Sequence, residues 1–287
     1  MKKIAAGIVF VLLWSSASVS TKFGLAVAEP FVLSSFRYTL AGLLMLGYVR
    51  ITTKTWYPTH LQEWKAVLTM ALLNITIYGA CFIWSIQEVA ASIGSLSLGV
   101  NPIFIAFMAT IWIKRPISFA EWIGMLLGII GIFVASYPFL QNGHATLFGI
   151  CLLLFSRFTY SVATIYFGKN QWTVSSTVVN AWQTLLGGAL LLPIAYATHV
   201  RENQFTFQFF AAIFWLIVPI AIVASQLWIY LIKQDPVKAS FWLFLCPVTG
   251  ICYAAIFLHE QVSWYTLVGG LCVLAGVYLA EREKRQR

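Results

Sequence analysis

Charge is what this chain has least of. Asp, Glu, Lys and Arg together make up only 9% of the 287 residues, whereas hydrophobic residues make up 60%. A water-soluble domain has about a quarter of its residues charged, because its surface must be covered. The composition therefore excludes a water-soluble domain and indicates an all-α integral membrane protein.

The chain also lacks the residue patterns of catalysis and metal binding. It has no HExxH motif and no acidic residue deep within an apolar segment, and its four histidines fall at the segment ends. An intramembrane enzyme would need a nucleophile with a base, paired carboxylates or metal ligands inside the bilayer. The five cysteines lie inside apolar segments without a CxxC pair, so neither disulfides nor a zinc site is indicated. We expect no enzyme activity, no metal and no cofactor.

Long apolar runs are what the chain has in abundance. Ten are long enough to cross about 30 Å of hydrocarbon as helices. They lie at roughly 4 to 22, 31 to 50, 66 to 87, 91 to 113, 120 to 137, 145 to 167, 173 to 198, 207 to 231, 237 to 258 and 262 to 280. Continuous runs disfavour a β-barrel, whose strands alternate. The first run follows two lysines, as in a secretory signal, but it continues past Trp14, so we interpret it as an uncleaved span.

The basic residues gather on one side of the predicted spans. With the N-terminus inside, inner segments hold fourteen Lys and Arg, and outer segments hold only Lys22 and Arg201. The positive-inside rule then places both termini in the cytoplasm. This sidedness explains the net charge of +9 without a nucleic-acid partner. We expect a multi-pass protein of the inner (cytoplasmic) cell membrane, in contact with lipid, with the choice between monomer and homodimer left open.

The chain contains two copies of one unit. Residues 91–136 align without a gap over 236–281, and Pro102 then meets Pro247. Ten of the 46 columns are identical, against roughly one in ten expected by chance for apolar segments. Because each copy holds an odd number of spans, the second enters the membrane from the opposite face, which makes an inverted repeat typical of transporters. We predict two five-helix repeats, 1–138 and 144–281, and a basic cytoplasmic tail, 282–287.

Several residues resemble those of one known family. They are Gly7, Trp14 and Lys22 in the first span, Pro30 and Arg37 in the second, Asn101 and Pro102 in the fourth, and His259, Glu260, Gly269 and Gly276 near the end. Together with the ten spans, they make the chain similar to the EamA type of the drug/metabolite transporter superfamily. Arg115 and Pro116 depart from the usual Gly-Glu of the first copy, so we assign that position no role. The resemblance implies short helix pairs, three-four and eight-nine, that rock around a cavity lined mainly by spans one, three, four, six, eight and nine.

Pro102 and Pro247 each remove a backbone hydrogen bond in the middle of a span. Their symmetric placement in the repeat predicts a gating role. The alternative is that both merely kink packed helices.

Arg157 lies about twelve residues into the sixth span, where a charge costs at least about 2.5 kcal/mol. With Tyr160 and Thr164 it forms a polar stripe on one helix face, and it therefore should face water or a ligand. The alternative is that it binds carbonyls freed by a proline kink. Arg37 lies nearer the outer face, and a structural or snorkelling role is the alternative to substrate contact there.

Other polar and aromatic side chains can contact a solute in a wet cavity, or can join helices instead. We select as further substrate-binding candidates Trp14, Ser18, Tyr78, Asn101, Gln226 and Trp242.

These observations predict a secondary transporter, an exporter or facilitator of small polar metabolites such as amino acids, that works by alternating access. A proton-coupled multidrug or cation exporter is the alternative, but it normally holds a mid-membrane carboxylate, which this chain lacks. A membrane receptor or scaffold is the alternative outside transport. The sequence leaves open the substrate, the direction of transport, ion coupling and the conformational state.

Overall fold

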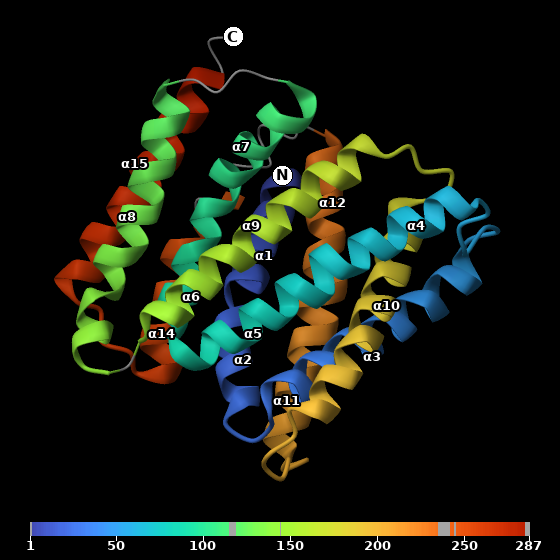
Figure 1. Ribbon diagram of the computed structural model, residues 1–287, viewed down its shortest axis with the longest axis horizontal. Coiled ribbons are helices and arrows are strands. Elements are labelled where there is room, and N and C mark those ends of the chain that lie inside the picture. The colour runs from blue at the N-terminus through green and yellow to red at the C-terminus, as the bar shows by residue number, and fades with distance from the viewer. Residues whose placement is uncertain (1, 115–118, 144, 235–241, 244, 285–287) are drawn as a thin grey trace.

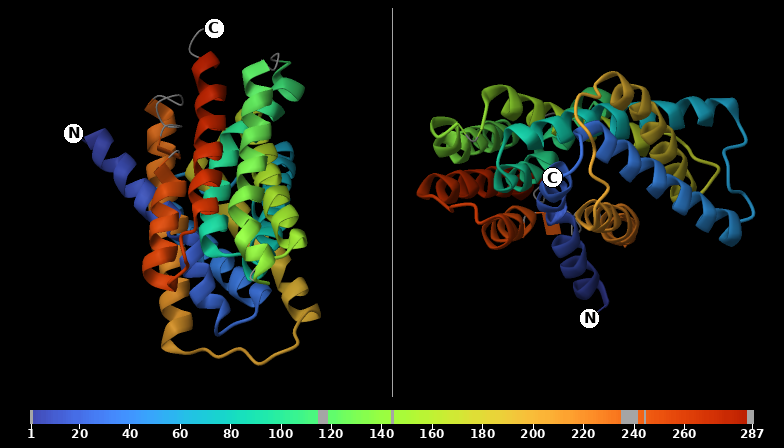
Figure 2. Two further views of the ribbon diagram at one scale, coloured as in Figure 1. Left: turned by 90° about the vertical axis from the view of Figure 1, so that its left-hand side faces the viewer. Right: turned by 90° about the horizontal axis from the view of Figure 1, so that it is seen from below.

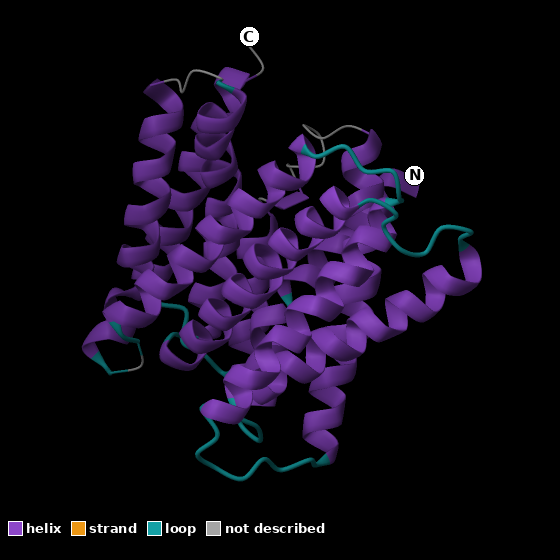
Figure 3. Cartoon of the chain, turned by 45° about the vertical axis from the view of Figure 1, so that its right-hand side comes forward, coloured by secondary structure: helices purple, strands orange, loops and turns teal. Residues whose placement is uncertain are grey.

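The computed structural model describes residues 2–114, 119–143, 145–234, 242–243 and 245–284. These residues form helices joined by short loops, with no strand among them (Figure 3). Within the described ranges, eight helices are long and apolar enough to cross a membrane, and two shorter apolar helices, Leu245–Leu258 and Trp264–Gly276, follow them. The all-helical membrane class is therefore confirmed, and eight of the ten predicted spans have full membrane length.

In the first half of the chain, three of the five apolar segments are interrupted helices. The elements are α1 (Lys2–Ser15) with α2 (Ala17–Leu25), α3 (Pro30–Thr52), α4 (Leu61–Met70) with the π-helix η1 (Ala71–Ile77) and α5 (Tyr78–Glu88), α6 (Ala91–Leu96) with the 3₁₀ segment η2 (Ser97–Val100) and α7 (Asn101–Ile113), and α8 (Phe119–Gln141).

The second half of the chain begins with one continuous helix. The elements are α9 (Leu147–Lys169), α10 (Ser176–Ala197), α11 (Phe207–Trp215) with the π-helix η3 (Leu216–Ala224) and α12 (Ser225–Gln234), α14 (Leu245–Leu258), and α15 (Trp264–Lys284).

Local irregularities recur at one separation along the chain. The π-helix that begins at Leu216 starts 145 positions after the one that begins at Ala71, the separation that also relates Pro247 to Pro102. Lys114 and His259, again 145 apart, both have φ of 54°, a left-handed conformation that residues other than glycine rarely adopt.

Helices from the two halves of the chain lie side by side. α8 packs along α15 at one edge of the molecule, and α3 packs along α10 at the other (Figure 1). The N- and C-terminal ends of the described chain lie toward the same end of the bundle (Figure 2). We call this the terminal end.

Glycines bring α8 and α15 into backbone contact. A Cβ at Gly276 would lie 2.5 Å from the carbonyl oxygen of Gly124, and one at Gly131 would lie 2.6 Å from that of Gly269. Lipid tails are as apolar as the helix surfaces, so close van der Waals packing drives such pairing in a membrane. The GxxxG of Gly124 and Gly128 therefore serves packing within the chain.

Pro102 lies in the first turn of α7, directly after η2. The fourth span is thus interrupted at this proline, because proline cannot donate the hydrogen bond that would continue the helix. Pro247 lies in the first turn of α14, and residues 235–241 and 244 before it are outside the described part. Both prolines keep their predicted gating role as a prediction.

Candidate functional site

A cavity of about 210 Å³ lies in the middle of the bundle. It is lined by the first, second, third, sixth, seventh and eighth apolar segments, with Leu98 alone from the fourth. The expected contribution of the ninth segment is wrong for its described residues, because α14 packs instead against α1 and α6. The second and seventh segments take its place, since α3 and α10 form one packed pair beside the π-helices.

The cavity extends toward the terminal end. Its lining includes Phe167, two residues before the end of α9, and Ser176, the first residue of α10. Toward the opposite end, the lining stops at Phe82 on α5, six residues before that helix ends at Glu88. Six residues of helix span about 9 Å, so protein closes this end, which we call the closed end.

Arg157 lies in the wall of this cavity and is only 2% exposed. Its Nε donates to Ser97 Oγ over 2.8 Å, and its terminal nitrogens donate to Tyr78 Oη over 3.1 Å and to the Gly94 carbonyl over 3.2 Å. Its guanidinium carbon lies 5.0 Å from the Phe82 ring centroid, a cation–π contact. Arg157 therefore both faces the cavity and ties α9 to the end of α6.

The contact with the Gly94 carbonyl agrees in part with the alternative role of Arg157, which is to bind backbone carbonyls rather than a ligand. Gly94 lies in α6 just before the helix tightens into η2, and a cation there interacts favourably with the helix C-terminus. No carboxylate in the described part of the chain lies within 4 Å of the guanidinium. Its charge is thus hydrogen-bonded but not neutralised.

Aromatic rings form much of the remaining wall. The Tyr78 and Tyr160 ring centroids are 5.5 Å apart, beside Arg157. Trp14 and Trp228 also line the cavity, and Phe10 stacks between them at 5.7 and 5.1 Å. Such surfaces contact apolar parts of a small molecule, while a few polar groups set its orientation.

Three amides form a chain across another part of the wall. Asn74 Nδ2 lies 3.4 Å from Gln183 Oε1, and Gln183 Nε2 donates to Asn180 Oδ1 over 2.7 Å. Asn74 belongs to η1, and Ile220, 145 positions after the lining residue Ile75, belongs to η3. Both π-helices thus face the cavity, and such bulges occur frequently at functional sites.

The structure places five of the eight predicted substrate-binding residues around the cavity: Arg157, Tyr160, Trp14, Ser18 and Tyr78. Thr164 of the predicted polar stripe lines it as well.

Asn101, Gln226 and Trp242 lie elsewhere. Asn101 is buried, with its carbonyl 3.4 Å from Ser161 Oγ. Trp242 packs directly against Gly7. Gln226 is half-buried on α12 and is not part of the lining. Their sequence positions lie on the predicted cavity helices, but helix rotation decides which face points inward. A role for them in binding stays a prediction.

Arg37 is the residue whose place the sequence did not resolve. It lines the cavity from α3, and its guanidinium carbon lies 4.9 Å from the Tyr38 ring centroid. Its depth in an apolar segment was the available signal, but depth alone does not distinguish a cavity from a lipid-facing or packed position.

At the closed end, carboxylates join helix ends to loops. Glu260 accepts hydrogen bonds from the backbone N–H groups of Ala91 and Ser92, over 2.6 and 3.0 Å. These are free donors at the start of α6, where the helix dipole also favours an anion.

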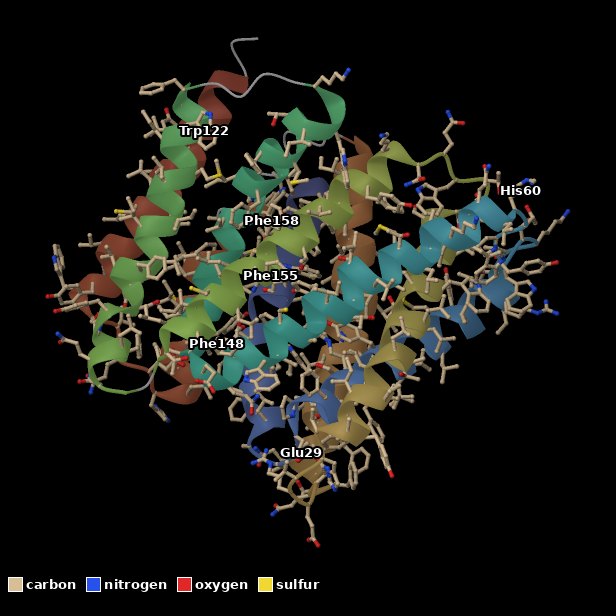
Figure 4. The ribbon with its side chains drawn as sticks, viewed as in Figure 1. Glu29, His60, Trp122, Phe148, Phe155 and Phe158 are labelled. Carbon is tan, nitrogen blue, oxygen red and sulfur yellow. The ribbon has the colours of Figure 1, made fainter. Side chains whose placement is uncertain are left out.

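Glu29 makes a similar junction in the loop before α3, and Figure 4 shows it at the closed end of the bundle. It accepts from the N–H groups of Val200 and Arg201 over 2.7 and 2.8 Å and lies 2.6 Å from His199. These hydrogen bonds, first that from Arg201, lower the pKa of Glu29 from 4.5 to about 2. His60 lies away from this end, at the edge of the bundle directly before α4 (Figure 4).

A bundle of membrane-length helices around a cavity that holds two arginines has the architecture of a multi-pass membrane transport protein. The model of the EamA-like transporter family matches residues 1–137 and 147–281, and the chain belongs to that family.

Relatives and a solved structure agree with this assignment. An uncharacterized transporter of Archaeoglobus fulgidus is 25% identical over 283 residues, 96% of each chain. The uncharacterized transporter YvbV of Bacillus subtilis is 24% identical over 96% of this chain and 90% of its own. A crystal structure superposes with a TM-score of 0.70 over 99% of this chain and 98% of its own, at 16% identity, which shows the fold alone.

Proposed function

We propose that the chain crosses the inner membrane of the cell ten times, as two inverted five-helix repeats, with both termini in the cytoplasm. The recurrence of π-helices, prolines and left-handed residues at a separation of 145 supports the repeat. The pairing of α8 with α15 and of α3 with α10 is what a two-fold axis between the halves would produce. The fourteen basic residues on one side support the orientation.

We further propose that the protein exports or facilitates the passage of small polar metabolites that bear a carboxylate, such as amino acids. The observation that carries this proposal is Arg157, a cation in the cavity wall with no carboxylate among the described residues to neutralise it. A guanidinium binds a carboxylate through two parallel hydrogen bonds. In this assignment Tyr160, Ser18 and Trp14 complete the contact surface.

Alternating access then requires the closed end to open. In the proposed cycle, short helices that begin near Pro102 and Pro247 move against the rest of the bundle. The interruption of the fourth span at η2 favours this, because a broken helix can bend without losing further backbone hydrogen bonds.

A proton-coupled exporter of cations is disfavoured by the cavity. Its lining contains two arginines and, among the described residues, neither aspartate nor glutamate. A cationic drug would meet repulsion there, and no carboxylate would exchange a proton for it. A receptor or scaffold role is disfavoured by the family and by the cavity.

The test is transport of amino acids by purified protein in liposomes, with free acids and their α-amides as competitors. We expect free acids to compete better. Arg157→Lys keeps the charge but loses the planar fork, so uptake should fall roughly tenfold or more. Arg157→Gln should remove the preference for the acid over the amide.

Arg50→Gln is the matched control, because Arg50 lies in the last turn of α3, over the Trp56 ring and outside the cavity. It should transport as the wild type does. If the wild type does not distinguish acid from amide, or if Arg157→Gln transports normally, Arg157 is structural and the proposal is wrong.

A further inference from the structure

The cavity holds two cations. Arg37 reaches it from α3 and Arg157 from α9. All nine acidic residues of the chain lie at or near predicted span ends, at positions 29, 63, 88, 121, 202, 235, 260, 281 and 283. The cavity lining within the described residues contains neither aspartate nor glutamate. The described lining therefore carries a fixed charge of +2.

Arg37 has an unused donor. Its Nε is buried and has no hydrogen-bond partner among the described residues. A buried donor without a partner is unfavourable. The terminal nitrogens of Arg37 are not among these buried atoms and donate to no described residue, so they are open to an acceptor that enters the cavity. Arg157, by contrast, uses three of its five N–H groups on Ser97, Tyr78 and Gly94.

The carboxylate just before the start of α3, that of Glu29, already has hydrogen-bond partners. Glu29 lies two turns before Arg37, but its oxygens accept from the N–H groups of Val200 and Arg201 and contact His199. Glu29 therefore belongs to the loop junction at the closed end and does not neutralise Arg37.

The two guanidinium groups flank one cluster of tyrosines. Arg37 lies over the Tyr38 ring. The edge of that ring packs against Gly79, with Cε2 at 2.9 Å from the position a Cβ would take. The neighbouring Tyr78 directs its Oη to Arg157. Tyr38 and Tyr78 thus connect the surroundings of both cations across one side of the cavity.

We propose that the transported solute carries two acidic charges and that Arg37 is the residue that selects for the second. One carboxylate at Arg157 would leave the charge of Arg37 uncompensated in a cavity of low dielectric, where such a charge is costly. A second acidic group restores neutrality and accepts hydrogen bonds from the Arg37 guanidinium. This inference rests on the assignment of Arg157 as the first anion site.

Two kinds of solute have this chemistry. A short dicarboxylate would place one carboxylate on each guanidinium, and a phosphate monoester would place both charges on one group between them. Both are acceptors that arginine binds bidentately.

Binding to detergent-purified protein tests the inference apart from transport. The probes are succinate and glutarate, each compared with its monoamide of nearly the same shape, and glycerol 3-phosphate compared with glycerol. The readout is the ligand-dependent rise in melting temperature, from which affinities follow. We expect at least one diacid to bind roughly 10- to 100-fold more tightly than its monoamide, or glycerol 3-phosphate to bind more tightly than glycerol by at least this factor. This factor is the equivalent of one hydrogen bond to a charged group, at about 1.5–3 kcal/mol.

Arg37→Gln should reduce the ratio of diacid to monoamide affinity to about one, lower the ratio of glycerol 3-phosphate to glycerol affinity without abolishing it, and leave monoamide affinity nearly unchanged. Arg37→Lys keeps the charge and should retain a smaller preference, which also guards against loss of folding in the Gln variant. Arg50→Gln should keep the wild-type ratio. Arg157→Gln should weaken diacid and monoamide alike.

Each result decides a separate point. A preference for a diacid alone assigns a dicarboxylate, and one for glycerol 3-phosphate alone assigns a phosphate ester. Equal binding of every pair by the wild type, absence of any stabilisation at millimolar ligand, or an unchanged preference in Arg37→Gln overturns the inference. If the preference is present but liposomes show no flux, the two-charge site stands and the proposed transport function fails. If amino acids cross the liposome membrane but diacids are not preferred, the proposed transport function stands and the two-charge site fails.

Discussion

Glu29 gives the closed end a pH-dependent contribution to stability. Its pKa is about 2 in the folded protein and 4.5 without these contacts, so folding favours its ionised form. The stabilisation is complete above pH 4.5 and is lost as the pH falls toward 2. We expect Glu29→Gln to melt at a lower temperature than the wild type at pH 7, with the difference shrinking as the pH falls from about 4.5 toward 2.

The matched control is Glu202→Gln, which removes an exposed carboxylate from the same loop. Its melting temperature should follow that of the wild type at every pH. A constant difference between Glu29→Gln and the wild type from pH 7 to pH 3 would contradict the assignment of the low pKa.

At the residue scale, depth in an apolar segment predicted Arg157 but not the full site. A charge near the middle of a span must find hydrogen bonds or water, so the position alone indicates an interior environment. Arg37 lies nearer a span end, where snorkelling competes, and only the packing of α3 against α10 places it in the cavity wall. Trp242 was chosen because its segment was expected to line the cavity, but its ring packs against Gly7.

At the element scale, the close packing of α8 against α15 depends on glycine. A Cβ at Gly269 would collide with the backbone oxygen of Gly131 and lie 2.7 Å from the Cβ of Ala135. Backbone cannot move aside cheaply, and overpacking costs about 1–3 kcal/mol. We expect Gly269→Ala to lower the melting temperature clearly in detergent and to reduce the yield of folded protein.

The neighbouring glycine supplies the control. A Cβ at Gly270 would meet only the Leu96 side chain, at 3.9 Å, which is ordinary contact. Gly270→Ala should therefore be neutral or slightly stabilising, since alanine favours the helix. Equal melting temperatures for the two variants would show that α8 and α15 do not pack through their backbones.

The internal alignment of the sequence found the glycines and prolines that shape the elements, because those residues act through the backbone. It did not find the π-helices at Ala71–Ile77 and Leu216–Ala224. Of the two, η3 contains Pro219, whose missing N–H favours a wider turn, whereas η1 contains no proline. A wide turn without proline depends on packing, here Thr76 Oγ1 at 3.2 Å from the Gly187 carbonyl, and packing is not visible in a hydropathy pattern.

At the scale of the whole molecule, the asymmetry of the cavity implies a defined state of the transport cycle. The lining reaches Phe167 and Ser176 at the terminal end, whereas Glu29 and Glu260 join segments at the other. With the proposed cytoplasmic termini, the structure is open to the cytoplasm and closed to the outside. The cavity is then accessible from the cytoplasm, in a state that every alternating-access cycle includes.

Cysteine accessibility tests this orientation and state together. In a variant with the five native cysteines replaced, we expect Ser176→Cys to react with a membrane-impermeant thiol reagent in inside-out vesicles but not in right-side-out vesicles. Val200→Cys should show the opposite pattern, because Val200 is 91% exposed in the loop at the closed end. The reversed pattern for both positions would show that the termini lie outside. Labelling of Ser176→Cys from the side that labels Val200→Cys would mean that the cavity opens at the other end. Protection of Ser176→Cys by a transported solute would place that solute in the cavity described here.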